Sequence, residues 1–515
     1  MRPQILVLTI GVLAWTAMAA EVPHGVFDVT TFGVKNDASV NQAQAIQRAI
    51  DACARAGGGT VYFPAGDYVS GTITLKNNVT LYLAGGATLW GSRRIEDYEP
   101  LHLIYAQNAE NIAIEGNGTI NGNGDAFWEP NFKAKAKRPT PLIELVGCRN
   151  VHIRDIRIRN MPGWGIHPWE CDGVFIRGIS MITDMRGPNT DGIDPDSSRN
   201  VMISDSYIEG GDDAICLKTT KRPGGGPVRA CENVTVTNCV LISDDSAIKL
   251  GTASYGDFRD CTFSNCVITG TRYGIAMYIK DGALVEGIRF SNITIDTSVA
   301  HYNQQTRSTR EWVEYPIFLD LEKRGENSVL SRVRDVSFSD ISIRSKGRVL
   351  VGGLPERPLE NLTFRNIVMR MTGFEPVEKQ KKPRGVANIR PTTPETDYST
   401  VPAAMIFANV AGLNLRDVNV IWDAAGVQDR HAVWAGHVSD LSIEGFRGAP
   451  SGAKLAAIGL EKVTRAFITG ARPAAGTAVF LGVNGVPDDE IVLTGNDFKK
   501  GTSPVQKGAV HVHLP

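Results

Sequence analysis

Short segments in which apolar and polar residues alternate recur along most of the chain. Typical examples are NVTLYL (78–83), NVHIRD (150–155), NVMISD (200–205) and DVSFSD (335–340), and the last one is IVLTGN (491–496). Such alternation is typical of a β-strand with one buried face. Successive segments mostly begin 23 to 33 residues apart, and a repeat of this length buries a core only by stacking on its neighbours. The pattern therefore predicts an all-β solenoid of parallel coils rather than a leucine-rich horseshoe, whose L-x-x-L-x-L signature does not recur.

Residues 40–56 follow a different period, with apolar side chains at Ile46, Ala49, Ile50 and Cys53. This spacing is helical, and the three glycines that follow mark the end of the helix. The open end of a stacked-repeat fold needs a cover. We therefore expect this helix to cap the N-terminal end of the solenoid.

The N-terminus is typical of a secretory signal peptide. Arg2 supplies the positive charge, residues 5–15 supply the apolar core, and Ala17-Met18-Ala19 supplies a cleavage sequence of small residues. The apolar run is too short to span a bilayer. We expect residues 1–20 to be removed and the mature protein to be secreted or periplasmic, with no membrane attachment.

The remaining chain shows no Pro/Gly/Ser-rich linker that would divide it. We expect residues 21–76 to form the cap and the first strands, and residues 77–515 to form one β-helix domain. Two long insertions, 296–332 and 371–402, interrupt the repeat. Insertions on a rigid scaffold often wall a binding cleft, and surface loops explain them equally well.

Charge and cysteine content narrow the function. The formal charge is −1 and the pI about 6.8, so the sequence does not predict a nucleic-acid partner; we expect a monomer. The eight cysteines of an exported chain would ordinarily suggest disulfides. However, Cys148, Cys171 and Cys231 open the same phrase, and Cys239 and Cys266 share another. Such repetition favours ladders of buried, mostly reduced cysteines, and no C-x-x-C pair suggests zinc.

Aspartates recur at equivalent positions of successive coils. Five Gly/Ala-Ile pairs, which begin at residues 165, 192, 214, 247 and 274, give the coils a common register. The residues just before these pairs form one column: Trp164, Asp191, Asp213, Ser246 and Tyr273. The residues one position further back are Gly163, Thr190, Asp212, Asp245 and Arg272. The residues just after the pairs are His167, Asp194, Cys216, Lys249 and Ala276.

This register predicts that Asp191, Asp212, Asp213 and Asp245 lie within a coil or two of one another. Clustered carboxylates repel, so one can keep a proton near neutral pH while its neighbours are ionised. Such a set is suited to acid–base cleavage of a glycosidic bond. We expect Asp194 and Asp196 to hydrogen-bond the turn rather than to react.

Four stretches carry a resemblance to a known family. Residues 27–75 resemble the N-terminal segment of the pectate-lyase-like superfamily, and EGNGTINGNGDAFW (115–128) resembles the G-x-G-x-I-x-G-x-G-x-x-W stretch of the polygalacturonases. NTDGID (189–194) and GGDDAI (210–215) match two of the four active-site motifs of that family. The chain thus resembles the polygalacturonase family, glycoside hydrolase family 28. The resemblance implies a single-stranded right-handed parallel β-helix.

The resemblance also implies an inverting hydrolase that acts on pectin or a related acidic polysaccharide or oligosaccharide, with no metal or organic cofactor. Asp212 would be the general acid that protonates the leaving oxygen, and Asp191 and Asp213 would hold and activate the attacking water. Candidate substrate-binding residues in and around the columns are Asn189, Trp164, His167, Asp245, Lys249, Tyr255 and Arg272. For His167 and Trp164, a structural role is the alternative.

Two motifs of the family are replaced in this chain. Its Gly-His-Gly falls at residues 245–247, where Ser246 takes the place of histidine, and its Arg-Ile-Lys falls near residues 276–278, where both cations are absent. In the family these basic residues serve the catalytic acid and grip the galacturonate carboxylate. Lys249 could supply the lost charge, with an outward-facing, solvated lysine as the alternative, and Arg272 and Lys280 are weaker candidates.

Two other functions remain open on the sequence alone. A β-helix lyase would use a Ca²⁺-binding carboxylate set and a base, for which Arg272 is a candidate, but the Asn-Thr-Asp motif would then be unexplained. A non-catalytic carbohydrate-binding β-helix is the other alternative.

Overall fold

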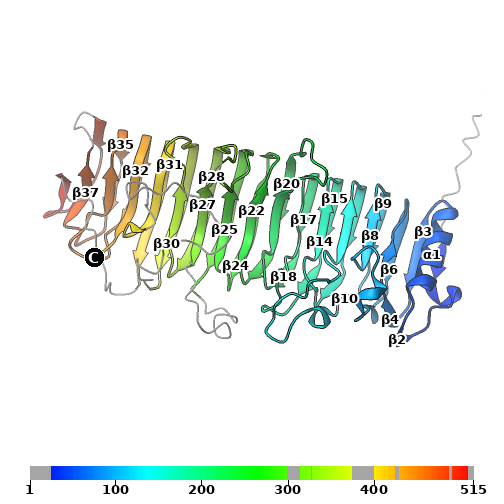
Figure 1. Ribbon diagram of the computed structural model, residues 1–515. Coiled ribbons are helices and arrows are strands. Elements are labelled where there is room, and N and C mark those ends of the chain that lie inside the picture. The colour runs from blue at the N-terminus through cyan, green and yellow to red at the C-terminus, as the bar shows by residue number, and fades with distance from the viewer. Residues whose placement is uncertain are drawn as a thin grey trace, which may run out of the picture.

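The computed structural model describes residues 25–298, 314–325, 327–373, 400–423, 429–485 and 490–507. These residues form an elongated right-handed parallel β-helix whose coils follow one another in chain order (Figure 1). Strands of neighbouring coils pair in parallel. The predicted fold class is confirmed. The predicted signal segment, 1–20, lies outside the described residues.

Helix α1 (Ala43–Arg55) covers the N-terminal end of the solenoid (Figure 1). Its buried residues are Ile46, Ala49, Ile50 and Cys53, as the spacing predicted. The helix begins three residues later than expected because strand β2 (Asp37–Asn41) precedes it and pairs with β4 (Gly66–Ser70). Among the described residues, no helix has the length and apolar character needed to cross a membrane.

The coils contribute three runs of paired strands. The first run contains the alternating segments: β1 (Val26–Asp28), β3 (Gly59–Phe63), β6 (Val79–Leu83), β9 (Glu110–Glu115), β12 (Arg149–Arg154), β15 (Asp172–Arg177), β17 (Arg199–Ser204), β20 (Cys231–Thr237), β23 (Phe258–Arg259), β24 (Thr262–Thr269), β26 (Leu284–Asp296), β28 (Arg332–Ser345), β30 (Leu359–Met371), β31 (Ala403–Trp422), β32 (His431–Glu444), β35 (Thr464–Thr469) and β38 (Ile491–Thr494). From β24 to β31 these strands are long and continue into the second run.

The second run begins with β2 and β4, and its other strands are β7 (Ala87–Gly91), β10 (Thr119–Asn121), β13 (Arg157–Arg159), β16 (Ser180–Ile182), β18 (Tyr207–Gly210), β21 (Val240–Ser243), β33 (Arg447–Gly448) and β36 (Arg472–Pro473). The third run contains β5 (Ile73–Thr74), β8 (Ile104–Gln107), β11 (Ile143–Val146), β14 (Ile166–Trp169), β19 (Ile215–Thr219), β22 (Ser246–Ser254), β25 (Tyr273–Ile279), β27 (Tyr315–Leu321), β29 (Val349–Gly352), β34 (Ile458–Glu461), β37 (Val479–Asn484) and β39 (Ser503–Lys507). Strands β31 and β32 also continue into the third run.

Side chains of the same type stack on one another in successive coils, both in the core and on the surface of the solenoid. Phe290 and Phe338 stack with ring centroids 4.9 Å apart, and Phe338 and Phe364 with centroids 4.5 Å apart. On the outer surface, Asn150 of β12 donates to Asn111 of β9 at 2.9 Å, and the backbone φ of Asn150 is 52°. Asparagine tolerates this left-handed conformation better than most residues, which explains why so many of the alternating segments begin with it.

All eight cysteines are buried and none forms a disulfide. Cys148 and Cys171 occupy equivalent positions of neighbouring coils, since the residues that follow them pair in register. Cys239 and Cys266 do the same. The prediction of reduced ladders is confirmed.

The first insertion is shorter than predicted. Within 296–332, residues Tyr315–Leu321 form strand β27, which pairs with β25 and β29. The segment was missed because all of its side chains are buried, so apolar and polar residues do not alternate. The central parts of the two insertions, 299–313 and 374–399, lie outside the described residues, so their role beside the cleft stays a prediction.

Candidate active site

The Gly/Ala-Ile register predicted from the sequence exists in the third run of strands. Ile166, Ile193 and Ile215 are successive partners, and the series continues from Ile215 to Ile248 and Ile275. These isoleucines are fully buried, so the side chains on either side of each one point away from the core. The residue directly after each isoleucine, such as Asp194 or Lys249, therefore lies on one outer face, and Asp191 and Asp213 lie in the irregular segments just before the isoleucines of their coils.

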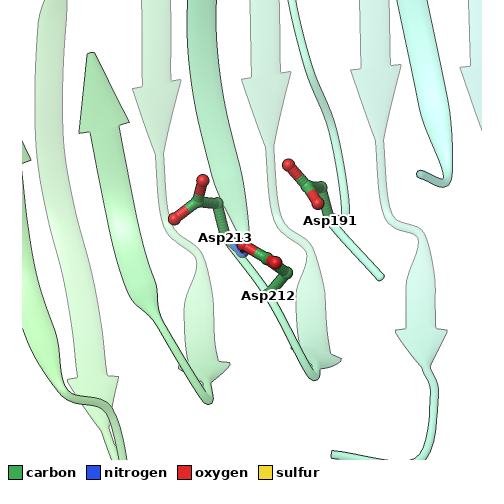
Figure 2. A group of neighbouring side chains, drawn as sticks. All are labelled: Asp191, Asp212 and Asp213. Atoms are coloured by element: carbon green, nitrogen blue, oxygen red, sulfur yellow. The ribbon is translucent and has the colours of Figure 1, made fainter. Parts of the chain in front are cut away.

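Three carboxylates from two neighbouring coils meet on this face (Figure 2). Asp191 lies on one coil, and Asp212 and Asp213 lie on the next. One oxygen from each of the three lies within 4.8 Å of the other two. Asp191 and Asp213 are 3% and 1% exposed, whereas Asp212 is partly exposed.

Two lysines neutralise part of this charge. The Lys249 Nζ lies 2.7 Å from Asp213 Oδ2. The Lys218 Nζ lies 3.1 Å from Asp191 Oδ2 and 3.2 Å from Asp194 Oδ1. Among the described residues, no ammonium or guanidinium group pairs with Asp212. The three carboxylates therefore differ in their cationic partners.

These partners separate the pKa values of the carboxylates. Burial, and then the charges of Asp191 and Asp213, raise the pKa of Asp212 well above its usual range. Burial also opposes ionisation of Asp213, but Lys249 and Lys218 outweigh it and lower its pKa. Burial, followed by Asp194, raises the pKa of Asp191 to about 8 against the effect of Lys218. The surroundings thus favour the protonated carboxyl at Asp212 and the ionised carboxylate at Asp213.

Asn189 is held directly beside the carboxylates. Its Nδ2 donates to Asp212 Oδ2 at 3.3 Å, while its Oδ1 accepts from an Arg138 guanidinium nitrogen at 3.0 Å. Arg138 also donates to the Pro188 carbonyl at 2.6 Å. Arg138 therefore fixes the loop that carries Asn189 and so places an amide donor on Asp212.

His167 is buried and contacts two carboxylates of the protein. Its ring is 7% exposed, with Nδ1 2.7 Å from Glu144 Oε2 and Nε2 3.4 Å from Asp196 Oδ2. Burial disfavours the charged ring, but Glu144 and Asp196 outweigh it and raise the pKa of His167 to about 10. Asp196 also accepts from the Thr220 backbone N–H at 2.8 Å, as expected of a residue that fixes a turn. With both ring nitrogens engaged, a direct contact with substrate stays a prediction.

The other candidate binding residues lie on both sides of the carboxylates along the solenoid axis. The partly exposed Trp164 has the Lys218 Nζ over its ring, 4.6 Å from the centroid. On the C-terminal side, Arg272 lies 2.6 Å from Asp245 Oδ1. Tyr255, directly after β22, is 39% exposed and has a guanidinium, that of Arg324, over its ring.

Residues 53–372, more than half of the chain, match the family described as glycosyl hydrolases family 28. The chain belongs to this family. A probable polygalacturonase of Vitis vinifera is 27% identical to it over 373 residues, which cover 66% of this chain and 73% of the plant protein. An exo-poly-alpha-D-galacturonosidase of Dickeya chrysanthemi is 27% identical over 447 residues, which cover 68% and 73% of the two chains.

Solved structures show the same fold. The exopolygalacturonase from Thermotoga maritima aligns with a TM-score of 0.58 and 21% identity over 69% of this chain and 88% of its own. The polygalacturonase from Erwinia carotovora ssp. carotovora aligns with a TM-score of 0.52 and 21% identity over 65% and 92% of the two chains. As a member of family 28, the protein is a glycoside hydrolase that acts on O-glycosyl bonds.

The three carboxylates of this family-28 hydrolase are close enough together to hold a cation. However, the ammonium groups of Lys218 and Lys249 already occupy positions against Asp191 and Asp213. We therefore assign no metal ligand among the described residues.

Lys218, Glu144 and Arg138 were missed in the sequence. Lys218 stands two positions beyond the column residue Cys216, and the pairing of Trp169 with Asp196 and of Asp196 with Lys218 shows that a further column exists there. Extending the register by two residues would have found it. Glu144 pairs with His167, but its coil has Leu142 in place of Gly or Ala. Arg138 comes from a loop without periodicity.

Proposed function

We propose that the protein is a secreted hydrolase that cleaves glycosidic bonds in pectin or a related acidic polysaccharide or oligosaccharide. The observation that supports the chemistry is that the three carboxylates have different partners. Lys249 pairs with Asp213, Lys218 pairs with Asp191, and Asp212 has a neutral amide partner. The names of the relatives support the substrate class. The signal-like N-terminus supports secretion, and we propose one catalytic β-helix domain that acts as a monomer.

In this proposal Asp212 is the general acid. Its raised pKa favours the protonated carboxyl, and the side chain is partly exposed, so it can donate a proton to the oxygen of the leaving sugar. Asp213 remains ionised beside Lys249 and accepts the proton of the attacking water, which Asp191 helps to hold. Asn189 orients the Asp212 carboxyl through its amide.

The family resemblance favours inversion at the anomeric carbon. Carboxyl groups are usually roughly 6.5–9.5 Å apart in inverting enzymes and roughly 5–5.5 Å apart in retaining ones, and here one oxygen from each of the three carboxylates lies within 4.8 Å of the other two. The configuration of the product is the direct test of the stereochemistry. Proton NMR of the first product formed should show the anomer opposite in configuration to the cleaved bond, and the same anomer would show that the enzyme retains configuration.

The substrate class is tested by incubation with homogalacturonan, rhamnogalacturonan and their oligomers, with products resolved by mass. We expect new reducing ends without added Ca²⁺ and without the ultraviolet absorbance of unsaturated products. Release from none of these substrates would refute the class. Unsaturated products would indicate a lyase, although the candidate lyase base Arg272 is paired with Asp245.

Asp212→Asn tests the assignment of the acid. General acid catalysis contributes about 10²–10⁴-fold, so turnover should fall by that factor while substrate binding is retained. The matched control is Asp205→Asn, an exposed aspartate with φ of 54°, a conformation that asparagine also adopts. A non-catalytic binding protein would show no turnover in either variant or in the unmodified protein.

A further inference from the structure

Lys218 is a buried cation in the middle of the candidate site. Its side chain is 9% exposed, and it projects from β19. The Nζ lies 3.1 Å from Asp191 Oδ2, 3.2 Å from Asp194 Oδ1 and 3.2 Å from the Cys216 Sγ. The ring of Trp164 packs against the same ammonium group. Lys218 is therefore in contact with two carboxylates, a thiol and an aromatic ring.

Lys218 faces more carboxylates than its single positive charge can neutralise. On the preceding coil, one ammonium group faces two carboxylates, Asp191 and Asp194. Asp213, on the same coil as Lys218, pairs with a different cation: the Nζ of Lys249 on the next coil lies 2.7 Å away. The titratable and charged groups that interact with this cluster come from the packed coils and from the loop of Arg138; they are Asp191, Asp194, His167, Asp196, Asp212, Asp213, Cys216, Lys249, Asp245 and Arg138.

We infer that Lys218 is a positioning residue of the hydrolytic site: its one ammonium group is shared by Asp191 and Asp194, so this pair keeps one proton and Asp213 is left as the carboxylate that accepts the proton of water. The inference rests on the proposed hydrolytic function. It deepens that function by identifying how a site with so many carboxylates presents one base and one acid.

The electrostatics of the cluster agree with this arrangement. Burial raises the pKa of Asp194 to about 6 even though Lys218 and His167 oppose it. The pKa of Asp191, raised by burial and by Asp194, stays at about 8. Lys218 also acts on Asp213 in the same direction as Lys249 and lowers its pKa against the effect of burial. Loss of Lys218 should therefore raise the pKa of all three carboxylates.

The pH dependence of kcat/KM separates this role from simple packing. Lys218→Met keeps the length of the side chain and removes the charge, so we expect the acidic limb, which reports ionisation of the base, to move up by about one pH unit, a roughly 10-fold loss at a pH on that limb. Asp194→Asn removes a competitor for the ammonium and a repelling charge, so the limb should move down. In the double variant, the acidic limb of kcat/KM should lie close to its position in the unmodified protein. Asp205→Asn is the control for the Asp-to-Asn change.

A second readout does not depend on activity. The infrared band of protonated carboxyl groups at pH 7 should grow by one group in Lys218→Met and shrink by one in Asp194→Asn. An unchanged band together with an unmoved limb in both variants would overturn the inference and leave Lys218 a packing residue. If Lys218→Met does not fold, the direction of the Asp194→Asn shift decides alone. If the unmodified protein cleaves no pectic substrate, the proposed function fails. The infrared measurement then still tests the role of Lys218.

Discussion

Removal of Lys249 should leave a buried carboxylate without its cation. The Lys249 and Asp213 side chains are 12% and 2% exposed, and their charged atoms lie 2.7 Å apart. At an effective dielectric of about 20, Coulomb's law gives roughly 6 kcal/mol for unit charges at that separation. Breaking such a buried pair from one side typically costs about 3–5 kcal/mol. We therefore expect Lys249→Met to lower the free energy of unfolding by about 3–5 kcal/mol at pH 7.

The loss has a limit that depends on pH, because Asp213 can take up a proton instead of remaining charged. Protonating a carboxyl whose ordinary pKa is 3.8 costs about 1.36 kcal/mol for each pH unit above that value. In the variant the pKa of Asp213 would be raised, so stability is lost as pH rises. In the unmodified protein the pKa is lowered, so its contribution is present above pH 3.8 and lost below. The difference between the two should therefore shrink by about 2.7 kcal/mol between pH 7 and pH 5.

Urea unfolding followed by tryptophan fluorescence measures this difference. In Lys249→Met/Asp213→Asn neither charge remains buried, so most of the stability should return. Lys454→Met is the exposed control, because Lys454 is 83% exposed and lies 3.7 Å from Asp429; it should cost at most about 1 kcal/mol. A loss below about 1 kcal/mol in Lys249→Met, or a loss that does not change with pH and persists when Asp213 is also replaced, would refute the reasoning.

Three further predictions concern the site and the stack. Asp191→Asn should gain stability relative to the unmodified protein as pH rises from 4 to 8, by up to about 1.36 kcal/mol per unit, because the raised pKa of Asp191, about 8, makes the native carboxyl lose stability over that range; urea unfolding at several pH values measures it, and a gain that is equal at all pH values would contradict it. Phe338→Ala should cost about 3–5 kcal/mol, whereas Phe467→Ala, at a side chain 45% exposed, should cost much less; equal losses would show that the phenylalanine stack is unimportant. Because all eight thiols are buried, a disulfide-exchange reagent should label them only after unfolding, and rapid labelling of the native protein would show that the ladders are accessible.

Periodicity predicted the scaffold because the core imposes it. Strands such as β12 and β17 have one buried and one exposed face, so apolar and polar residues alternate along them. The register of the site was predictable for a related reason, since Ile193 and Ile215 must each be buried between adjacent coils. Strand β27 was not predictable in this way, because both of its faces are covered and its sequence contains no alternation.

The charges of the site were harder to predict than its backbone. Sequence register placed Lys249 in the right column, but whether its ammonium group faces a substrate or Asp213 depends on side-chain direction, which periodicity does not determine. Lys218 was overlooked because the aligned columns ended at Cys216. Arg138 reaches Asn189 from 51 positions away in the chain, and no local pattern predicts such a contact.

The cations of this site form ion pairs with its own carboxylates. Lys218, Lys249 and Arg272 each lie within salt-bridge distance of an aspartate on the same outer face, and a buried carboxylate set of this density requires such compensation. The family resemblance implies a histidine and an Arg-Ile-Lys motif for this region, and here Ser246 and residues 276–278 take their places. A cation that already neutralises a buried aspartate binds a substrate carboxylate only at the expense of that pair. In the part of the site that the structure describes, we therefore expect hydrolysis to depend on the charged columns and sugar recognition to depend more on neutral groups at their margins, such as Trp164 and Tyr255.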